Sequence, residues 1–372
     1  MNILILSWRS QGHPNAGGAE QVTFEHAKAW VMGGHDVCLF SSFYIGAKRD
    51  EKVSGVRIIR SGEAVFGVKI RAFLWYFLKK HPKFDLVVDE FHGIPFFTPL
   101  YVRSRKLGFI HEVAREVWKL NPWPKPLNIL PSIFGIFFER YIFRLFYRKI
   151  PFLTVSNSTK FDLVDWGIPK NNITIIQNGV KLHLPKILPD KEAKKTAIYL
   201  GAISEDKGTF DAVRVFGEIE RKDDNWQYWI VGTGTGAYIR KLKQLARDVG
   251  IIEKLKIWGY VTDSKKFDLL ASAQLLINPS YHEGWGLVNI EANSVGTPVV
   301  GYNVHGLKDS VVNNKTGILV GKGEYKALAE NALKLVGNKI EYQSMQKNCR
   351  KWASKFNWKK ATKESLELIE SL

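Results

Sequence analysis

Two glutamates, Glu283 and Glu291, lie eight positions apart in the stretch YHEGWGLVNIEA, with glycines between them. Gly284 and Gly286 leave room for a ligand beside the backbone, and the helix expected to follow directs its first amide groups at that ligand. Such amides suit a diphosphate, whereas carboxylates accept hydrogen bonds from hydroxyl groups. The pattern predicts a diphosphate between two hydroxyl-bearing rings, as in a nucleotide-sugar. The alternative is that Glu283 caps the helix and Glu291 is a solvated surface acid.

Two other stretches suit an anion. Lys207, in LGAISEDKG, follows an expected strand, where an ammonium group can stabilise the charge that grows on a departing diphosphate. NAGGAEQV places Gly17 and Gly18 before an expected helix, which repeats the arrangement at Gly284 and Gly286. Each of these two stretches is weak by itself, because exposed lysines and turns at paired glycines are common.

Cofactor and metal chemistry are not indicated. VGTGTG, residues 231–236, matches a dinucleotide fingerprint only in part, and no acidic residue stands at the right distance downstream, so hydride transfer is disfavoured. The chain contains no DxD triplet to hold a phosphate-bridging metal. We therefore predict a site that works without a metal and without a cofactor.

Short apolar segments alternate with amphipathic stretches along the chain, which predicts α/β structure with parallel sheets covered on both faces. A basic, proline-containing segment over residues 181–197 separates two similar halves. We predict two Rossmann-like, doubly wound domains that face a cleft, over residues 1–186 and 187–354. A helix over 355–372 closes the chain and can pack back on the first domain. The expected strands are NILILS, HDVCLFSS, VRIIR, DLVVDE and FLTVS, then TAIYLGA, WQYWIVG, LKIWGYV, AQLLINPS and GTPVVGY.

The composition indicates an anionic partner. Lys and Arg number 54 against 36 acids, a formal net charge of +18, which suits nucleic acid, an acidic membrane surface or phosphorylated substrates. The basic residues do not form a known nucleic-acid module, so nucleic acid is disfavoured. Cys38 and Cys349 are the only cysteines and form no CxxC, and we expect a cytoplasmic protein without a signal peptide.

Together these motifs resemble the retaining glycosyltransferases of family four, which have the two-domain GT-B fold. The resemblance covers nearly the whole chain, and the E-x7-E element of Glu283 and Glu291 is its most specific part. It implies metal-independent transfer of a hexose-type sugar from a nucleotide diphosphate sugar to an acceptor hydroxyl, with retention of configuration. The matching segments are GGAE, GGHDVCLF, VSNSTKFDLVDWGIPKNNITIIQNGV, LGAISEDKG, VGTGTG, IWGYV and HEGWGLVNIEANSVGTPVV.

The resemblance also implies roles for single residues. Glu283 contacts the transferred sugar, Glu291 contacts the ribose hydroxyls and Lys207 faces the diphosphate. His111, in FIHEVARE, lies near the sugar and the acceptor, although its own context equally suits a strand-end histidine with satisfied hydrogen bonds. Members commonly carry an arginine where this chain has Ala202, so that charge is missing unless Arg9 or another cation replaces it. The remaining donor-binding residues are Gly17, Gly18, Gly284, Trp285, Gly286, Leu287 and Val288.

One stretch is unusually aromatic and indicates an acceptor at a membrane surface: PLNILPSIFGIFFERYIFRLFYRKIPFL. Arg140, Arg144 and Arg148 are four apart beside a broad apolar face, the pattern of a helix that lies in a membrane interface, and Val65–Lys80 is similar. The alternative is a core helix with a few surface arginines. No uncharged run reaches the roughly 20 residues that span a bilayer. The expected acceptor is a lipid-linked saccharide or glycolipid on the inner face of the membrane.

Other functions stay open. A nucleotide-sugar 2-epimerase shares the fold and needs no acceptor, and a non-catalytic relative would explain Ala202. The donor base, the sugar, the acceptor and the oligomeric state do not follow from the sequence.

Overall fold

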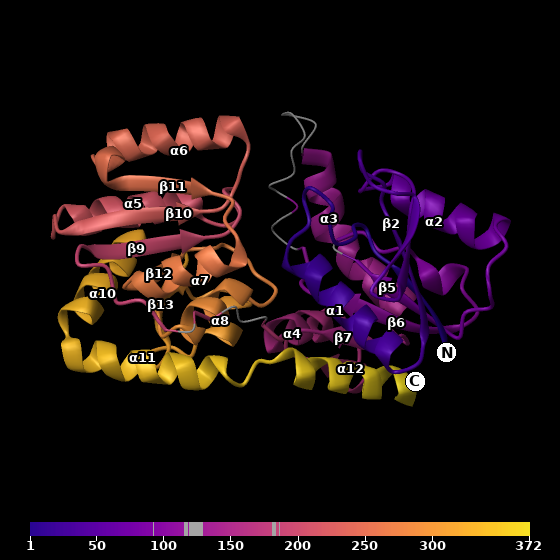
Figure 1. Cartoon of the computed structure of the whole chain (residues 1–372). Helices are drawn as coiled ribbons and strands as arrows, with labels where there is room; N and C mark the ends of the chain where they lie inside the picture. The colour runs from indigo at the N-terminus through magenta and orange to yellow at the C-terminus, as the bar shows by residue number, and fades with distance from the viewer. Residues whose placement is uncertain (92, 115–117, 119–128, 181–183, 186) are drawn as a thin grey trace. The chain divides into compact units, whose positions relative to one another are not determined.

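The computed structural model describes every residue except 92, 115–117, 119–128, 181–183 and 186, and the chain forms two compact units (Figure 1). Unit 1 contains Met1–Gly179 and Trp358–Leu372, and unit 2 contains Val180–Asn357. The division comes after Gly179 rather than after residue 186. The reason is that the amide of Val180 already donates a hydrogen bond to the carbonyl of Phe356 in unit 2, at 3.3 Å.

In the described part of unit 1, the strands form one sheet in the order β3-β4-β2-β1-β5-β6-β7-β8. The predicted parallel pairing is confirmed except at one edge, where β3 and β4 are antiparallel. Ser54 and Gly55 both have positive φ there, which allows a two-residue hairpin. The strands are β1 (Asn2–Leu6), β2 (Asp36–Ser41), β3 (Asp50–Val53), β4 (Val56–Arg60), β5 (Leu86–Glu90), β6 (Arg105–Ile110), β7 (Phe152–Thr154) and β8 (Ile173–Ile175).

The last helix of the chain belongs to unit 1. Helix α12 lies beside α1 (Figure 1), and the hydroxyl of Ser365 on α12 bonds to Nδ1 of His26 at 2.8 Å and to Nε1 of Trp30 at 3.2 Å. This helix begins at Trp358 rather than at residue 355, because Phe356 packs against Trp285 in unit 2. The helices are α1 (Gly18–Met32), α2 (Gly67–Leu78), α3 (Ile129–Ile142), continued by a π-helical turn at Phe143–Tyr147, α4 (Asn157–Asp165) and α12 (Trp358–Ser371).

Unit 2 is built on a sheet whose strands pair in parallel in the order β11-β10-β9-β12-β13-β14. Alternate strand residues point to opposite faces, so Tyr199 and Ile277 pack with α5 and α10, whereas Ile198 and Leu276 pack with α7 and α8. This two-sided burial explains the continuously apolar strands. The strands are β9 (Lys195–Leu200), β10 (Trp226–Val231), β11 (Leu255–Gly259), β12 (Leu275–Asn278), β13 (Val299–Tyr302) and β14 (Gly317–Val320).

Helices α5 to α9 of unit 2 connect these strands in the manner expected of parallel sheets, and α10 and α11 follow the last strand. The helices are α5 (Thr209–Glu220), α6 (Gly236–Asp248), α7 (Asp263–Ser272), α8 (Leu287–Ser294), α9 (Leu307–Ser310), α10 (Tyr325–Gly337) and α11 (Lys339–Ala353). Over all residues that the structure describes, in both units, no helix has the length and apolar character needed to cross a bilayer.

Candidate functional site

A partly buried loop joins β12 to α8 in unit 2. Gly286 is the N-cap of α8 and has φ +77, a conformation that L side chains rarely adopt. A Cβ at this position would lie 2.7 Å from the side-chain nitrogen Nδ2 of Asn289 and 2.9 Å from the hydroxyl oxygen of Ser310. Asn289 is held by Asn278 at 2.8 Å and donates to Ser310 at 2.9 Å. This network sets where the amides at the start of α8 point.

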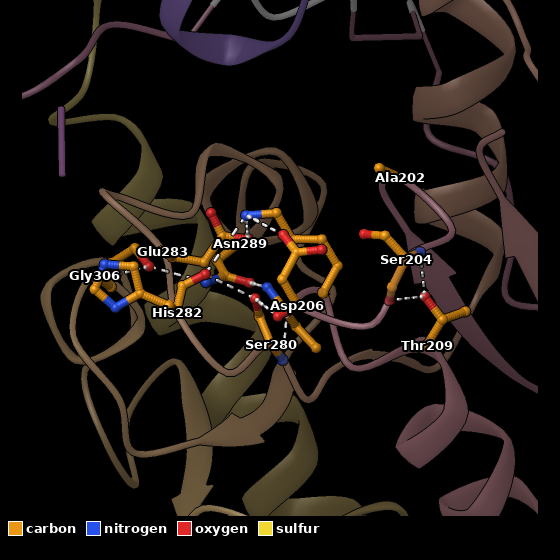
Figure 2. Close-up of polar contacts among 12 residues, drawn as sticks. Ala202, Ser204, Asp206, Thr209, Ser280, His282, Glu283, Asn289 and Gly306 are labelled. Atoms are coloured by element: carbon orange, nitrogen blue, oxygen red, sulfur yellow. Dashed lines mark hydrogen bonds and ion pairs between the residues drawn. The ribbon is translucent and has the colours of Figure 1, made fainter. Parts of the chain in front are cut away.

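The backbone of Glu283 is packed just as closely. Gly306, which precedes α9, has φ +79, and a Cβ there would lie only 2.1 Å from the carbonyl oxygen of Glu283. Figure 2 shows the two residues side by side. The close approach fixes the loop that carries Glu283, so Gly306 is a determinant of the site that the sequence prediction did not include.

Lys207 comes from the loop between β9 and α5 and lies beside Glu283. Its Nζ is 3.1 Å from Oε1 of Glu283 and 3.5 Å from the carbonyl oxygen of His282. The two loops are joined through Asp206, whose carbonyl accepts the amide of Tyr281 at 2.9 Å and the hydroxyl of Ser280 at 3.2 Å (Figure 2). The structure therefore brings together the two residues that the sequence selected as the sugar-side acid and the phosphate-side cation.

Glu283 does not cap α8, because the N-cap position belongs to Gly286. The carboxylate of Glu283 is 18% exposed and the Lys207 side chain is 26% exposed, so a ligand can reach both. An ammonium and a carboxylate at this separation attract each other strongly only where water is partly excluded. A diphosphate would compete with Glu283 for the same ammonium group.

Glu291 lies on α8 and pairs with a residue that the sequence prediction missed. Its Oε1 is 2.7 Å from Nζ of Lys266 on α7, and Lys266 also lies 3.1 Å from Asp263. Burial opposes the charge on Lys266, but the attraction of Glu291 and its hydrogen bond outweigh burial and raise the pKa of Lys266. Glu291 is thus a mostly buried, ion-paired acid, which excludes the interpretation as a solvated surface residue.

Between the two acids, Trp285 is buried, whereas Leu287 and Val288 are partly exposed. The Trp285 side chain is 3% exposed and packs edge-on against Phe356, with ring centroids 5.3 Å apart. Like the first amides of any α-helix, those of Leu287 and Val288 have no partner inside the helix. Gly284 and Gly286 therefore flank a short stretch of main chain that can receive an anion.

In unit 1, Gly17 and Gly18 open α1 next to an arginine. Gly17 is the N-cap, and its amide donates to Oε2 of Glu20 at 2.7 Å. Arg9, after β1, donates to the carbonyl of Asn15 at 2.6 Å and lies 3.8 Å from Glu20. Burial lowers the pKa of Arg9, and the nearby Glu20 and Glu90 partly restore it. Arg9 thus belongs to the same loop as the two glycines.

His111 follows β6 and is largely buried. Its Nε2 faces Thr23 on α1, with 3.4 Å to the hydroxyl oxygen, and Glu90 at the end of β5, with 3.7 Å to Oε1. Glu90 is 1% exposed, and burial raises its pKa to about 8. The sequence prediction included His111 but not Glu90. An acid that ends an apolar strand was the signal that could have revealed it.

Ala202 offers no side-chain charge where an arginine was expected, and its carbonyl accepts the hydroxyl of Tyr199 at 2.7 Å. Within the described residues, no group of three or more His, Cys, Asp or Glu side chains could hold a metal ion.

Two family descriptions match the chain, one after the other. Residues 16–184 match "Glycosyltransferase Family 4", and residues 181–352 match "Glycosyl transferases group 1". The glycogen synthase of Mycobacterium tuberculosis is 23% identical over 407 residues, which cover 96% of this chain and 92% of that protein.

Solved structures share the fold at low identity. The sucrose-phosphate synthase of Thermosynechococcus elongatus has a TM-score of 0.80 at 18% identity, covering 100% of this chain and 98% of that one. Anabaena Alr3699/HepE in complex with UDP-glucose has a TM-score of 0.73 at 16% identity, covering 100% of both chains.

Proposed function

Because this chain belongs to family 4 of the glycosyltransferases and has the GT-B fold, we propose that it moves a hexose-type sugar from a nucleotide diphosphate sugar to an acceptor hydroxyl, with retention. One observation carries this proposal. Lys207, before α5, and Glu283, before α8, are both accessible, and Nζ of the lysine lies 3.1 Å from Oε1 of the glutamate. The UDP-glucose bound to a protein of the same fold supports a nucleotide-sugar as the donor.

In the proposed reaction, the diphosphate occupies the amides between Gly284 and Val288. The ammonium of Lys207 moves from Glu283 to the diphosphate, where it stabilises the charge that develops as the anomeric carbon–oxygen bond breaks. The acceptor oxygen bonds to the same carbon, and its proton passes to the departing phosphate oxygen. No nucleophile of the enzyme is needed, and neither is a metal.

Glu283, released from Lys207, accepts hydrogen bonds from the transferred sugar, and Glu291 accepts those of the ribose. Arg9, Gly17 and Gly18 are proposed contacts of the donor phosphates, and Arg9 would supply the charge that Ala202 lacks. His111 is proposed to lie near the sugar and the acceptor.

A donor panel tests this function. Thermal unfolding with UDP-, GDP- and ADP-sugars should show one base that raises the midpoint, and Glu283→Gln should keep that shift while losing turnover. NMR of the product should show an unchanged anomeric configuration. If the donor alone is converted to a sugar with an inverted C2 centre, the protein is an epimerase and the proposal is wrong.

For the acceptor, we propose a lipid-linked saccharide reached from an anionic bilayer surface. Helix α2 buries only Val68 and Ala72 and exposes large apolar side chains. Near the end of α3, Phe137 and Tyr141 are 61% and 62% exposed. Parts of both helices are thus exposed, although Val68 and Ala72 of α2 and Phe143 of the π-helical turn after α3 lie in hydrophobic cores. The exposed apolar residues of α2 and its N-cap are Phe66, Ile70, Phe73, Leu74, Phe77 and Leu78.

Charge complementarity supports a bilayer as the occupant of these faces. Arg71, Lys79 and Lys80 are exposed on or directly after α2. On α3 and the π-helical turn that follows, Arg140, Arg144 and Arg148 are exposed, although Arg140 also donates to the carbonyl of Asp165 at 3.3 Å. Basic groups beside exposed aromatic and aliphatic side chains suit acidic headgroups over an acyl boundary.

Vesicle sedimentation tests the bilayer. The protein should sediment with vesicles that contain phosphatidylglycerol, less so at high salt, and not with pure phosphatidylcholine. Ile70→Asn combined with Leu78→Asn should abolish this, whereas Ile340→Asn, at an 83% exposed position in unit 2, should not. Equal binding of all variants would contradict the proposed surface.

A further inference from the structure

Glu90 and His111 end two neighbouring parallel strands, β5 and β6, so their side chains emerge at the same edge of the sheet. Oε1 of Glu90 lies 3.7 Å from Nε2 of His111. The imidazole is fixed from other sides, since its ring lies 4.4 Å from that of Phe109 and the His111 carbonyl accepts the hydroxyl of Thr159 at 3.0 Å. A small rotation of Glu90 would therefore close a direct hydrogen bond.

The side chain of Glu90 is almost completely buried. Its side chain is 1% exposed, and its Oε2 is buried without a hydrogen-bond partner among the residues that the structure describes. An ionised carboxylate would not persist in such a place without a close cation, whereas a neutral acid would.

The charged and titratable groups around Glu90 come from every neighbouring element. The pKa of Glu90 is raised to about 8, with burial as the largest cause. Glu20 on α1 and Asp89 on the same strand also raise it, while the Ser7 hydroxyl and Lys69 on α2 act in the opposite direction. Arg9, after β1, also interacts with Glu90, and His111 faces it from β6. The acids and the burial outweigh the cations, so Glu90 carries its proton at neutral pH.

We propose that Glu90 is a positioning residue for sugar transfer: as a neutral carboxylic acid it forms one hydrogen-bonded pair with Nε2 of His111 and holds the imidazole uncharged. The Thr23 hydroxyl, 3.4 Å from the same nitrogen, also restrains the imidazole. A neutral imidazole keeps one nitrogen–hydrogen donor without adding positive charge beside the acceptor. This inference rests on the proposed function only in assigning the pair to sugar transfer.

Two variants separate this role from a structural one. Glu90→Gln keeps the shape and the neutral hydrogen-bonding capacity, and Glu90→Ala removes both. With UDP-glucose as donor and water as acceptor, kcat of the wild type should fall above about pH 8. Glu90→Gln should retain kcat at pH 7 within a few-fold and lose that alkaline decline. Glu90→Ala should reduce kcat at every pH with the KM for UDP-glucose unchanged.

Asp89→Asn is the matched control. Asp89 is the adjacent buried acid, and it faces other partners, with the hydroxyls of Thr98 and Tyr147 at 2.7 and 2.6 Å. Its substitution should lower the thermal midpoint and keep an alkaline decline, moved to lower pH because the charge of Asp89 helps to raise the pKa of Glu90. An inactive but folded Glu90→Gln would overturn the proposal, because the carboxylate form would then be the active one. So would an unchanged decline in that variant.

A second readout does not depend on turnover. The ring-nitrogen NMR signals of His111 should report a neutral imidazole at pH 7 in the wild type and in Glu90→Gln, and should change near pH 8 only in the wild type. An imidazolium at pH 7 would overturn the pairing. Should the wild type release no nucleoside diphosphate from any UDP-, GDP- or ADP-sugar of the donor panel while this signature is present, the proposed function fails and the Glu90–His111 pair stands.

Discussion

Each unit has an acid at or shortly after the end of a parallel strand, and the surroundings of the two acids differ. In unit 2, Glu283 follows β12, is 18% exposed and has the ammonium of Lys207 3.1 Å away. In unit 1, Glu90 ends β5, is 1% exposed and lies 3.7 Å from the imidazole of His111. The first acid has partial solvation and a counter-charge, whereas burial raises the pKa of the second to about 8. The end of a parallel strand fixes where an acid lies, and its surroundings decide its charge.

The largest expected effect is at the Lys207–Glu283 pair of unit 2. Lys207→Met should lower kcat by about 10²–10³, because the developing charge on the diphosphate loses its nearest ammonium. Steady-state kinetics with the donor found in the sugar panel measures this. Glu283→Gln should lower kcat similarly but bind free UDP at least as tightly, since it removes the acid that competes for Lys207. If calorimetry shows UDP binding lost in Glu283→Gln but kept in Lys207→Met, the assigned roles are reversed.

Gly306→Ala should disturb the position of Glu283 without changing its chemistry. The added Cβ would lie 2.1 Å from the carbonyl oxygen of Glu283, so one of the two loops must move. We expect kcat to fall roughly tenfold or more and the free energy of unfolding to drop by about 1–3 kcal/mol.

Gly323→Ala is the control for backbone strain. Gly323 has φ +85 in the same unit, but a Cβ there meets nothing within 4 Å. It should lose stability and keep activity. Equal losses of kcat in both variants would mean that the contact between Gly306 and Glu283 is irrelevant.

A smaller effect is expected at the second acid of unit 2. Lys266→Met removes the ammonium 2.7 Å from Glu291 and so changes how that carboxylate is held. The KM for the donor should rise about five- to tenfold with little change in kcat, because the ribose is held equally in the ground state and the transition state. Lys265→Met, one residue earlier on α7, is the control. A fall in kcat alone would place Glu291 at the reacting sugar instead.

The neutral acid of unit 1 predicts a pH dependence of stability. Between about pH 4.5 and 8, folded Glu90 keeps a proton that the unfolded chain releases, so the wild type loses stability as pH rises through this window. Relative to Glu90→Gln, the free energy of unfolding should fall by up to about 1.4 kcal/mol per pH unit. Urea unfolding at several pH values measures it. A flat difference would show that Glu90 titrates normally.

Much of unit 2 was predictable because its signals are local. Each apolar strand is visible in its own segment. Gly286 at a helix start and Glu283 three residues before it lie within one short stretch, and Lys207 follows a recognisable strand. Lys266 escaped prediction because its contact with Glu291 joins two helices, α7 and α8, that are distant in sequence. Gly306 escaped for the same reason, since nothing in its own segment indicates the carbonyl of Glu283.

Unit 1 was less predictable at its site than in its strands. DLVVDE was identified as a strand, but the burial of Glu90 arises only when α1 and β6 close around its end. The strand β6, RKLGFI, was not predicted, because two of its first residues are basic and a glycine interrupts it. The membrane-interface prediction for α2 stays a prediction, with its exposed apolar residues now placed.

Helix α12 affects the order in which the two units can finish folding. Residues 1–179 of unit 1 are synthesised before unit 2, yet the partner of His26 and Trp30 is Ser365, which leaves the ribosome only after all of unit 2 has been made. A nascent chain can complete the second Rossmann-like core while the flank of α1 is still bare, so unit 2 can finish folding first and unit 1 needs protection meanwhile. A fragment that stops at Gly179 would keep that bare flank permanently. Dissecting the protein into halves therefore calls for a circular permutant that restores α12 to unit 1.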